Sequence, residues 1–169
     1  MKKYLLLLLV LSINAGADVI SSGANGFQIK IERTAAVDVQ TAYGQFLNVG
    51  DWWNADHTWF GDASGLYIEP YVGGCFCEKS ADKQALHMTV SYIDPGNEIR
   101  MVGGLGPLQM MGVHGGMSWR FVAVGDKETK IIQHYQVTGF AKDGLASLAP
   151  IVDQVQTLQH ESLVSLLND

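Results

Sequence analysis

The chain has 169 residues, a formal net charge of −6, 11 Lys and Arg residues and 47% hydrophobic residues. This length suits a single domain with a substantial core, and the scattered basic residues argue against a nucleic-acid partner or an anionic membrane surface. The two cysteines, Cys75 and Cys77, are too few and too close together for a framework of disulfides, so the core must supply most of the stability.

Residues 1–17 have the pattern of a signal peptide. Two lysines precede an almost unbroken apolar run over 4–13, and the small residues Ala15 and Ala17 suit a signal peptidase. The run is about half of the roughly 20 apolar residues that a membrane-spanning helix needs, so we expect cleavage after Ala17 rather than a membrane anchor. The mature protein is then expected to be periplasmic or secreted, without a membrane span.

The mature chain is predicted to begin with a flexible leader, a strand and a short helix. Residues 18–25 are small and polar, which is typical of a leader, and a single domain is expected over 26–169. Residues 27–33 alternate apolar and polar side chains, as a half-buried strand does. Residues 37–49 carry apolar side chains at helical spacing, with Asp38 near the start, where the helix dipole favours an acid.

The middle of the chain predicts a series of strands separated by Gly, Pro and Asp residues. Tight-turn sequences at 94–97 and 125–127 favour antiparallel hairpins, so consecutive strands should form a meander. The expected strands are 66–70, 75–79, 86–93, 98–103, 117–124 and 129–138.

Residues 147–167 predict a long amphipathic helix with Pro150 in its first turn, where the missing N–H costs little. The apolar stripe of this helix must be buried against the apolar face of the sheet. We therefore expect an α+β fold in which a curved antiparallel sheet grips the C-terminal helix, and a cavity between them would be the natural place for a ligand. The stripe consists of Leu148, Ile151, Val152, Val155, Leu158, Leu163, Leu166 and Leu167.

This order of elements resembles the SRPBCC or START helix-grip superfamily, and most closely its bacterial branch of polyketide cyclase-like and heat-shock ATPase activator-like proteins. The resemblance covers about 27–167 and implies the helix-grip fold. Because this superfamily includes binders, carriers and enzymes, it implies little about function. The heat-shock activators act on a cytosolic chaperone, which an exported chain would not meet. The matching segments are 53–59, 73–78, 87–90, 104–108 and 135–139.

Cys75 and Cys77 are two residues apart on a predicted strand, so their side chains should point to the same face. Three interpretations remain open. They could be free thiols packed as small hydrophobes, they could form a strained disulfide in a very small ring, or they could join His57 and His87 in a zinc site. The C-x-C spacing differs from the usual C-x-x-C zinc knuckle, and no cofactor is expected.

Glu78 should share a strand face with Phe76. If Phe76 enters the core, Glu78 is a carboxylate near the cavity, and a buried carboxylate can act as a general acid or base. The alternative is that Glu78 lies beyond the pocket in solvent. His87, a single histidine on a strand, is more often structural or exposed than catalytic.

The aromatic segment after the short helix is expected to line the mouth of the cavity through Trp53, His57 and Trp59. Gln133 shares a face with apolar residues, and because a buried amide without hydrogen bonds is costly, we expect it to give the cavity a specific polarity. Met110 and Met111, beside a glycine, could form a mobile flap.

We therefore expect an exported binder or carrier of a small hydrophobic molecule. One alternative is a cyclase or dehydratase that uses Glu78 or a histidine as acid and base, and another is a zinc-holding structural protein. Motifs of serine hydrolases, P-loop proteins, zinc proteases and dinucleotide-binding proteins are absent from the sequence. The predicted ligand-binding residues are Trp53, His57, Trp59, Phe76, Glu78, Met88, Met101, Trp119, Gln133, Tyr135 and Val155.

Overall fold

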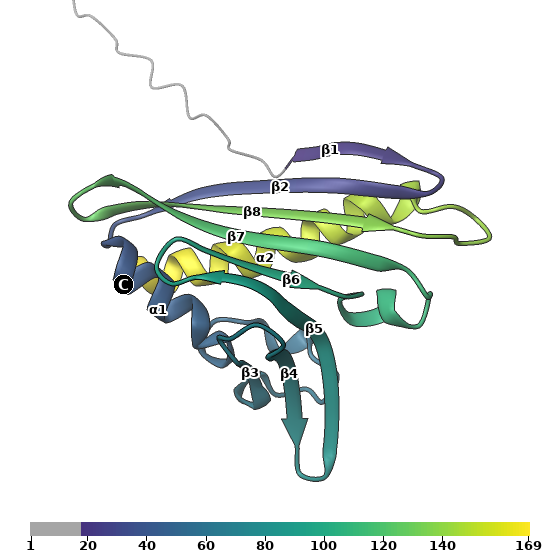
Figure 1. The fold of residues 1–169 in the computed structure, drawn as a ribbon, viewed down its shortest axis with the longest axis horizontal. Coiled ribbons are helices and arrows are strands. Elements are labelled where there is room, and N and C mark those ends of the chain that lie inside the picture. Colours follow the sequence, from purple (N-terminus) through teal and green to yellow (C-terminus); the bar gives the residue numbers. More distant parts are fainter. Residues whose placement is uncertain (1–17) are drawn as a thin grey trace, which may run out of the picture.

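A computed structural model describes residues 18–169, so the predicted signal peptide lies outside the described residues. Within them, eight strands form one antiparallel sheet in the order β1-β2-β8-β7-β6-β5-β4-β3. The sheet curves around the C-terminal helix, as expected for a helix-grip fold (Figure 1). The strands are β1 (Asp18–Gly23), β2 (Gly26–Ala35), β3 (Leu66–Ile68), β4 (Cys75–Ser80), β5 (Lys83–Asp94), β6 (Glu98–Val102), β7 (His114–Gly125) and β8 (Glu128–Thr138).

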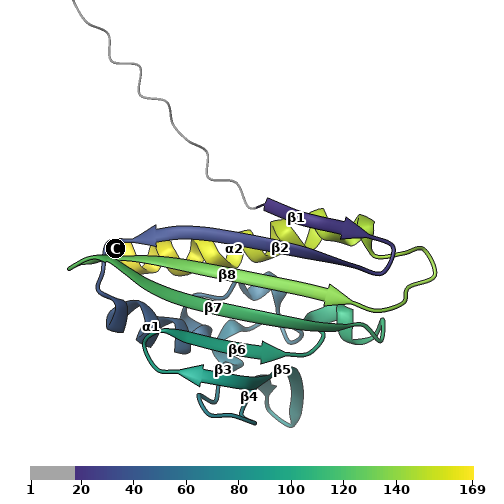
Figure 2. The same ribbon diagram turned by 45° about the horizontal axis from the view of Figure 1, so that its top comes forward.

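Two α-helices cover the inner face of the sheet, and Figure 2 shows both behind the central strands. They are α1 (Val39–Leu47) and α2 (Ala149–Asn168), accompanied by the short 3-10 turns η1 (Val49–Asp51), η2 (Ala55–His57), η3 (Ala63–Gly65), η4 (Gly106–Gln109) and η5 (Ala146–Leu148). The predicted short helix, the six strands that follow it and the long last helix are all confirmed. No helix among residues 18–169 combines the length and hydrophobicity needed to cross a bilayer.

The prediction of a flexible leader over 18–25 is wrong. Residues Asp18–Gly23 form β1, which pairs with β2 through a hairpin whose register brings Gly23 opposite Gly26. The segment shows no strand pattern in its sequence because the strand lies at the sheet edge and the side chains of residues 19–23 are exposed. Backbone hydrogen bonding to β2 therefore orders this segment without a hydrophobic face.

The first helix, α1, begins directly after Asp38, the acidic residue that was expected near its start. The Asp38 side chain accepts hydrogen bonds from the backbone N–H groups of Gln40 and Thr41, both at 3.0 Å, so it serves as the N-cap. These bonds to the charged form lower the pKa of the Asp38 carboxyl.

The buried face of α2 differs from the predicted apolar stripe. Gln156, Gln159 and His160 are buried, whereas Ile151 and Leu158 are 58% and 43% exposed. The helix is therefore rotated so that polar side chains face the sheet. They can be buried there because partners on neighbouring elements bond the two glutamines.

The C-terminal half of α2 lies over a densely packed aromatic core. The Phe46 ring lies 5.0 Å from that of Trp119 and 5.4 Å from that of Phe121, measured between centroids. The imidazole of His160 packs on Trp119 at 5.0 Å, and Leu163, one turn further along α2, is fully buried. Side chains thus fill the space between sheet and helix at this end of the interface.

Candidate functional site

The other end of the sheet–α2 interface is hollow. A cavity of about 400 Å³ lies there, and its wall comes from four parts of the chain: the aromatic segment 53–59, His87 on β5, the segment 105–111 around η4, and the first turns of α2. Tyr135 of β8 adds to the wall. The exposed wall residues, which mark the opening, include Trp59 at 46%, Met111 at 38% and Ile151 at 58%.

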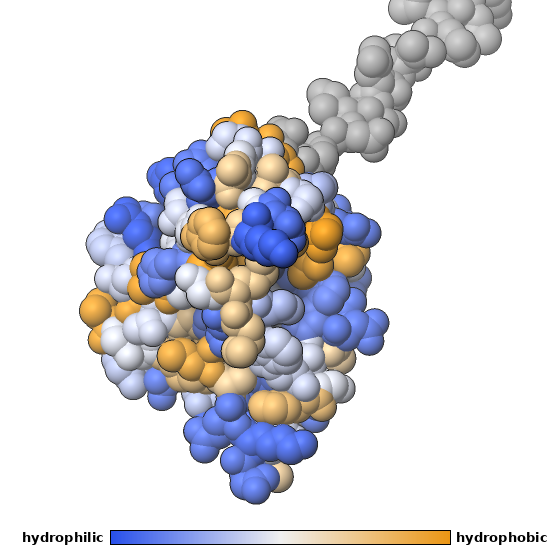
Figure 3. All heavy atoms as spheres, turned by 90° about the vertical axis from the view of Figure 1, so that its right-hand side faces the viewer, coloured by the Kyte–Doolittle hydropathy of each residue, from blue (hydrophilic) through white to orange (hydrophobic). Residues whose placement is uncertain are grey.

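Figure 3 views the molecule from the end where the β7–β8 side of the sheet meets the start of α2. Apolar and hydrophilic residues alternate on this face and do not form one continuous apolar surface.

The aromatic segment is held in place by hydrogen bonds to its own backbone and to α2. The Trp53 indole donates to the carbonyl of His57 at 3.1 Å. The Gln159 side chain of α2 accepts from the Asn54 amide at 2.8 Å, and its Nε2 lies 2.6 Å from His57 Nδ1. These hydrogen bonds hold the aromatic segment as a fixed wall. They also give both polar atoms of the Gln159 side chain a partner, which allows this side chain to be buried.

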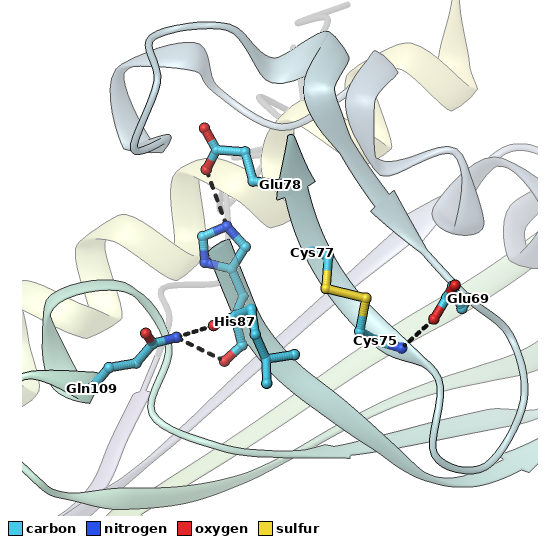
Figure 4. The surroundings of a disulfide bond; sticks show 7 residues. Glu69, Cys75, Cys77, Glu78, His87 and Gln109 are labelled. Atoms are coloured by element: carbon cyan, nitrogen blue, oxygen red, sulfur yellow. Dashed lines mark hydrogen bonds and ion pairs between the residues drawn. A yellow bond between two sulfur atoms is a disulfide. The ribbon is translucent and has the colours of Figure 1, made fainter. Parts of the chain in front are cut away.

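Glu78 lies completely buried behind this wall. Its Oε2 accepts a hydrogen bond from the Trp59 amide at 3.0 Å, and its Oε1 accepts from the Phe60 amide at 2.8 Å. Glu78 Oε2 also lies 3.1 Å from Nε2 of His87 (Figure 4). The alternative that Glu78 lies in solvent is therefore wrong. The carboxylate lies next to the cavity, behind the wall residues Trp59 and His87.

A β-bulge turns His87 toward the inside. Phe76 pairs with Met88, whereas the next residue on β4, Cys77, pairs with Leu86, so His87 is the extra residue of β5. Regular alternation would place His87 on the face opposite Met88, but the bulge lets both side chains be buried, at 5% and 1% exposure. Gln109 of η4 donates to the carbonyls of Leu86 and His87 and so ties the cavity segment to the bulge (Figure 4).

The surroundings of His87 determine which ring nitrogen carries the proton. Burial lowers the pKa of His87, although the neighbouring Glu78 opposes this shift. Because the Glu78 carboxylate accepts two backbone N–H groups, the nearby Nε2 must donate to it rather than face it with a lone pair. The other nitrogen, Nδ1, then carries a free lone pair, and it has no hydrogen-bond partner among the described residues.

Tyr135 and Gln156 supply further polar atoms to the wall. The Tyr135 hydroxyl accepts from the Leu105 amide at 3.2 Å, and burial raises the pKa of Tyr135 to about 12. Gln156 Oε1 accepts from Nε2 of Gln133 at 2.6 Å. Gln133 itself lies behind the wall. The polar amide side chain that lines the cavity is therefore that of Gln156 on α2, to which Gln133 is hydrogen-bonded.

The predicted ligand-binding residues divide into two groups. Trp53, His57, Trp59, Tyr135 and Val155 line the cavity, and their contact with a ligand stays a prediction. The other six are not among the residues that line it. Glu78 and Gln133 lie behind the wall, Phe76 is packed between the rings of Trp53 and His87, at 5.3 and 4.9 Å, and Met88, Met101 and Trp119 are core side chains.

Several wall residues were not predicted from the sequence. The segment 105–111 and the start of α2 contribute Leu105, Leu108, Leu148 and Val152. The Gly-Pro sequence beside Leu108 and the flap proposed around Met111 pointed to this loop. No sequence signal showed that it folds over the cavity, because this depends on the Gln109 hydrogen bonds to the bulge.

Cys75 and Cys77 form a disulfide, with 5.4 Å between their Cα atoms (Figure 4). The free-thiol interpretation is therefore wrong, and so is the zinc site, because oxidised sulfurs are no longer thiolate ligands. His57 and His87 are bonded to Gln159 and Glu78 and not to a common centre. Residues 18–169 contain no group of three or more His, Cys, Asp or Glu side chains suited to a metal.

Comparison with known proteins supports the fold but names no function. No family model and no curated protein sequence matches the chain. A conserved protein of unknown function from Enterococcus faecalis superimposes with a TM-score of 0.59 at 12% identity over 90% of this chain and 77% of its own.

Two further solved structures give similar values. The Mll3558 protein from Rhizobium loti has a TM-score of 0.59 at 18% identity, over 83% of this chain and 96% of its own. DynU16, a protein from the dynemicin biosynthetic locus, has a TM-score of 0.57 at 11% identity, over 83% of this chain and 46% of its own. At such identities the likeness concerns the fold alone.

Proposed function

We propose that this protein binds or carries one small, largely apolar molecule in the cavity between the sheet and the first turns of α2. The observation that carries the proposal is the cavity itself, which remains open while the rest of the sheet–helix interface is packed. Its volume of about 400 Å³ lies in the lower part of the range of about 300–1,000 Å³ for small-molecule sites. This favours a compact molecule over a lipid with two acyl chains.

A cavity-filling substitution tests the proposal. Val155→Phe enlarges a wall residue, while Val122→Phe makes the same change on the outer face of β7, where Val122 is 37% exposed. The neutral probe N-phenyl-1-naphthylamine should bind the wild type and Val122→Phe equally and Val155→Phe at least tenfold more weakly. Probe fluorescence titration measures this, and equal affinity of all three proteins would contradict the proposal.

An acid–base enzyme is a second candidate, favoured by the contact between Glu78 and His87. In that role His87 would take a proton from a substrate in the cavity, and Glu78 would stabilise the resulting imidazolium. Deuterium exchange from D2O into the ketone 4-phenyl-2-butanone, followed by mass spectrometry, provides a test. Exchange no faster than with His87→Gln would remove this candidate for carbonyl substrates.

We also propose export and membership of the SRPBCC superfamily. Export is supported by the signal pattern in residues 1–17 and by the Cys75–Cys77 disulfide, which suits an oxidising compartment. Membership is supported by the helix-grip topology and the fold shared with DynU16. Intact-mass analysis of an osmotic-shock extract from the natural host should find a chain that begins at Asp18, and a full-length chain confined to the cytoplasm would contradict export.

A further inference from the structure

The ionisable residues of the cavity wall limit the charge of its ligand. Among the described residues that line it, the ionisable side chains are Asp56, His57, His87 and Tyr135, and none is a lysine or arginine. An anionic group such as a carboxylate would lose its hydration without gaining a cationic partner, and the buried Glu78 carboxylate lies next to His87. An anionic ligand is therefore disfavoured.

His87 supplies a hydrogen-bond acceptor in this wall. Its Nε2 is committed to Glu78 at 3.1 Å, which leaves Nδ1 as a lone-pair nitrogen. The side chain is 5% exposed, and Nδ1 has no partner within residues 18–169. Figure 4 shows this nitrogen on the side of the ring away from Glu78, toward the segment that carries Gln109. A buried acceptor without a partner is costly, so a ligand that donates a hydrogen bond would gain from reaching it.

Tyr135 complements this acceptor. Its hydroxyl oxygen accepts from the Leu105 amide, and its own proton has no acceptor among the described residues. With a pKa raised to about 12, the phenol keeps this proton at neutral pH and can donate it to a ligand oxygen. A hydroxyl group can donate to one residue and accept from another, which an ether or a hydrocarbon cannot do.

We infer that the cavity selects a neutral, hydroxyl-bearing apolar molecule, an alcohol or a phenol, whose O–H donates to Nδ1 of His87. This inference rests on the proposed binding function and specifies the ligand class of the same site. The β-bulge that turns His87 inward and the buried Glu78 that fixes its tautomer are then positioning features for ligand recognition.

Three matched probes test the inference by isothermal titration calorimetry at neutral pH: 4-butylphenol, its methyl ether and 4-butylbenzoate. The phenol should bind at least tenfold more tightly than the ether, which lacks the donor, and than the benzoate, which carries a negative charge. His87→Gln keeps a donor for Glu78 but lacks the acceptor at Nδ1, so it should lower phenol affinity to that of the ether. His134→Gln, on the exposed outer face of β8, is the control and should change nothing.

A second measurement covers the case in which His87→Gln does not fold. In ¹⁵N NMR spectra of the wild type, the Nδ1 resonance of His87 should shift when the phenol binds and much less with the ether. Equal affinities for phenol and ether, together with loss of both in Val155→Phe, would overturn this inference and leave the binding function standing. Tighter binding of the benzoate would also overturn it. Failure of all three probes and of the naphthylamine probe would reject the binding function as well.

Discussion

The two ends of the sheet–α2 interface differ in how the same elements meet. At the C-terminal end of α2, the ring centroids of Phe46 and Trp119 lie 5.0 Å apart, and the imidazole centroid of His160 lies 5.0 Å from that of Trp119. At the N-terminal end the same helix and sheet enclose about 400 Å³. Stability is therefore expected to depend mainly on the first end and ligand binding on the second.

The difference comes from what fills the space, and not from the topology. α1 supplies Phe46 to the packed end, and η1 is followed by Trp52, whose ring lies 5.9 Å from that of Phe46. At the hollow end, the aromatic segment 53–59 and the segment 105–111 line the cavity without filling it. A helix-grip protein can thus combine a rigid core with a cavity by placing its large side chains at one end.

The largest expected effect comes from removing a buried leucine at the packed end. Leu163→Ala should lower the free energy of unfolding by about 3–4 kcal/mol, because a fully buried side chain loses its contacts and leaves a new cavity. Leu108→Ala, a matched change in the cavity wall, should cost at least about 1 kcal/mol less, because part of its surroundings is already empty. Urea unfolding of both variants measures the contrast, and equal losses would contradict it.

Replacing the buried carboxylate should have the next largest effect. Glu78→Gln should cost about 2–3 kcal/mol, because an amide group cannot accept from Trp59, Phe60 and His87 together. Thermal unfolding measures the loss. Glu69→Gln is the control and should cost less, because a glutamine oxygen can still accept the hydrogen bond from the Cys75 amide. A neutral Glu78→Gln variant would show that Glu78 does not hold the aromatic segment.

Acid should destabilise the packed end. Burial lowers the pKa of His160 to about 3, with nearby Arg33 acting in the same direction, whereas an unfolded histidine titrates near its ordinary 6.5. A lowered folded-state pKa means that this stability is fully present above about pH 6.5 and is lost as the pH falls toward 3. The slope from this residue approaches about 1.4 kcal/mol per pH unit.

His160→Leu should therefore show a shallower decline of unfolding free energy between pH 6 and pH 4 than the wild type. His114→Gln, at the exposed start of β7, is the control and should keep the wild-type slope within a few tenths of a kcal/mol per pH unit. An unchanged slope in His160→Leu would show that this histidine is not the acid-sensitive group.

The smallest effect is expected from the disulfide, which lies outside the comparison between the two ends. Replacing Cys75 and Cys77 together with serine should lower stability by only about 1–2 kcal/mol, because a bridge between residues two apart restricts little of the unfolded chain. Differential scanning calorimetry with and without reductant measures this. A loss above about 3 kcal/mol would mean that the bridge also holds the neighbouring bulge.

Most of the fold could be predicted from the sequence, because its signals are local. Alternation over 129–138 and the turn residues at 94–97 indicate strands and hairpins, and Asp38 indicates a helix start. The exceptions depend on long-range contacts. β1 is ordered by backbone pairing with β2, and the rotation of α2 is set by partners of Gln156 and Gln159 that are distant in the sequence.

The candidate site was less predictable for the same reason. The aromatic segment around Trp53 and Trp59 was found because its composition is unusual. His87 was not recognised as a wall residue, because period-two alternation places it on the face opposite Met88, and only the register between β4 and β5 reveals the bulge. Trp119 is also among the predicted ligand-binding residues but lies in the packed core, because sequence alone does not show which end of an inner face is packed.

A crystal structure of the protein purified from its natural compartment tests the central claim most directly. We predict electron density for one small molecule at the hollow end, with an oxygen within hydrogen-bonding distance of His87 Nδ1 and the Glu78–His87 contact intact. A structure in which side chains of the 105–111 segment fill this space, with no ligand and no remaining cavity, would contradict the account.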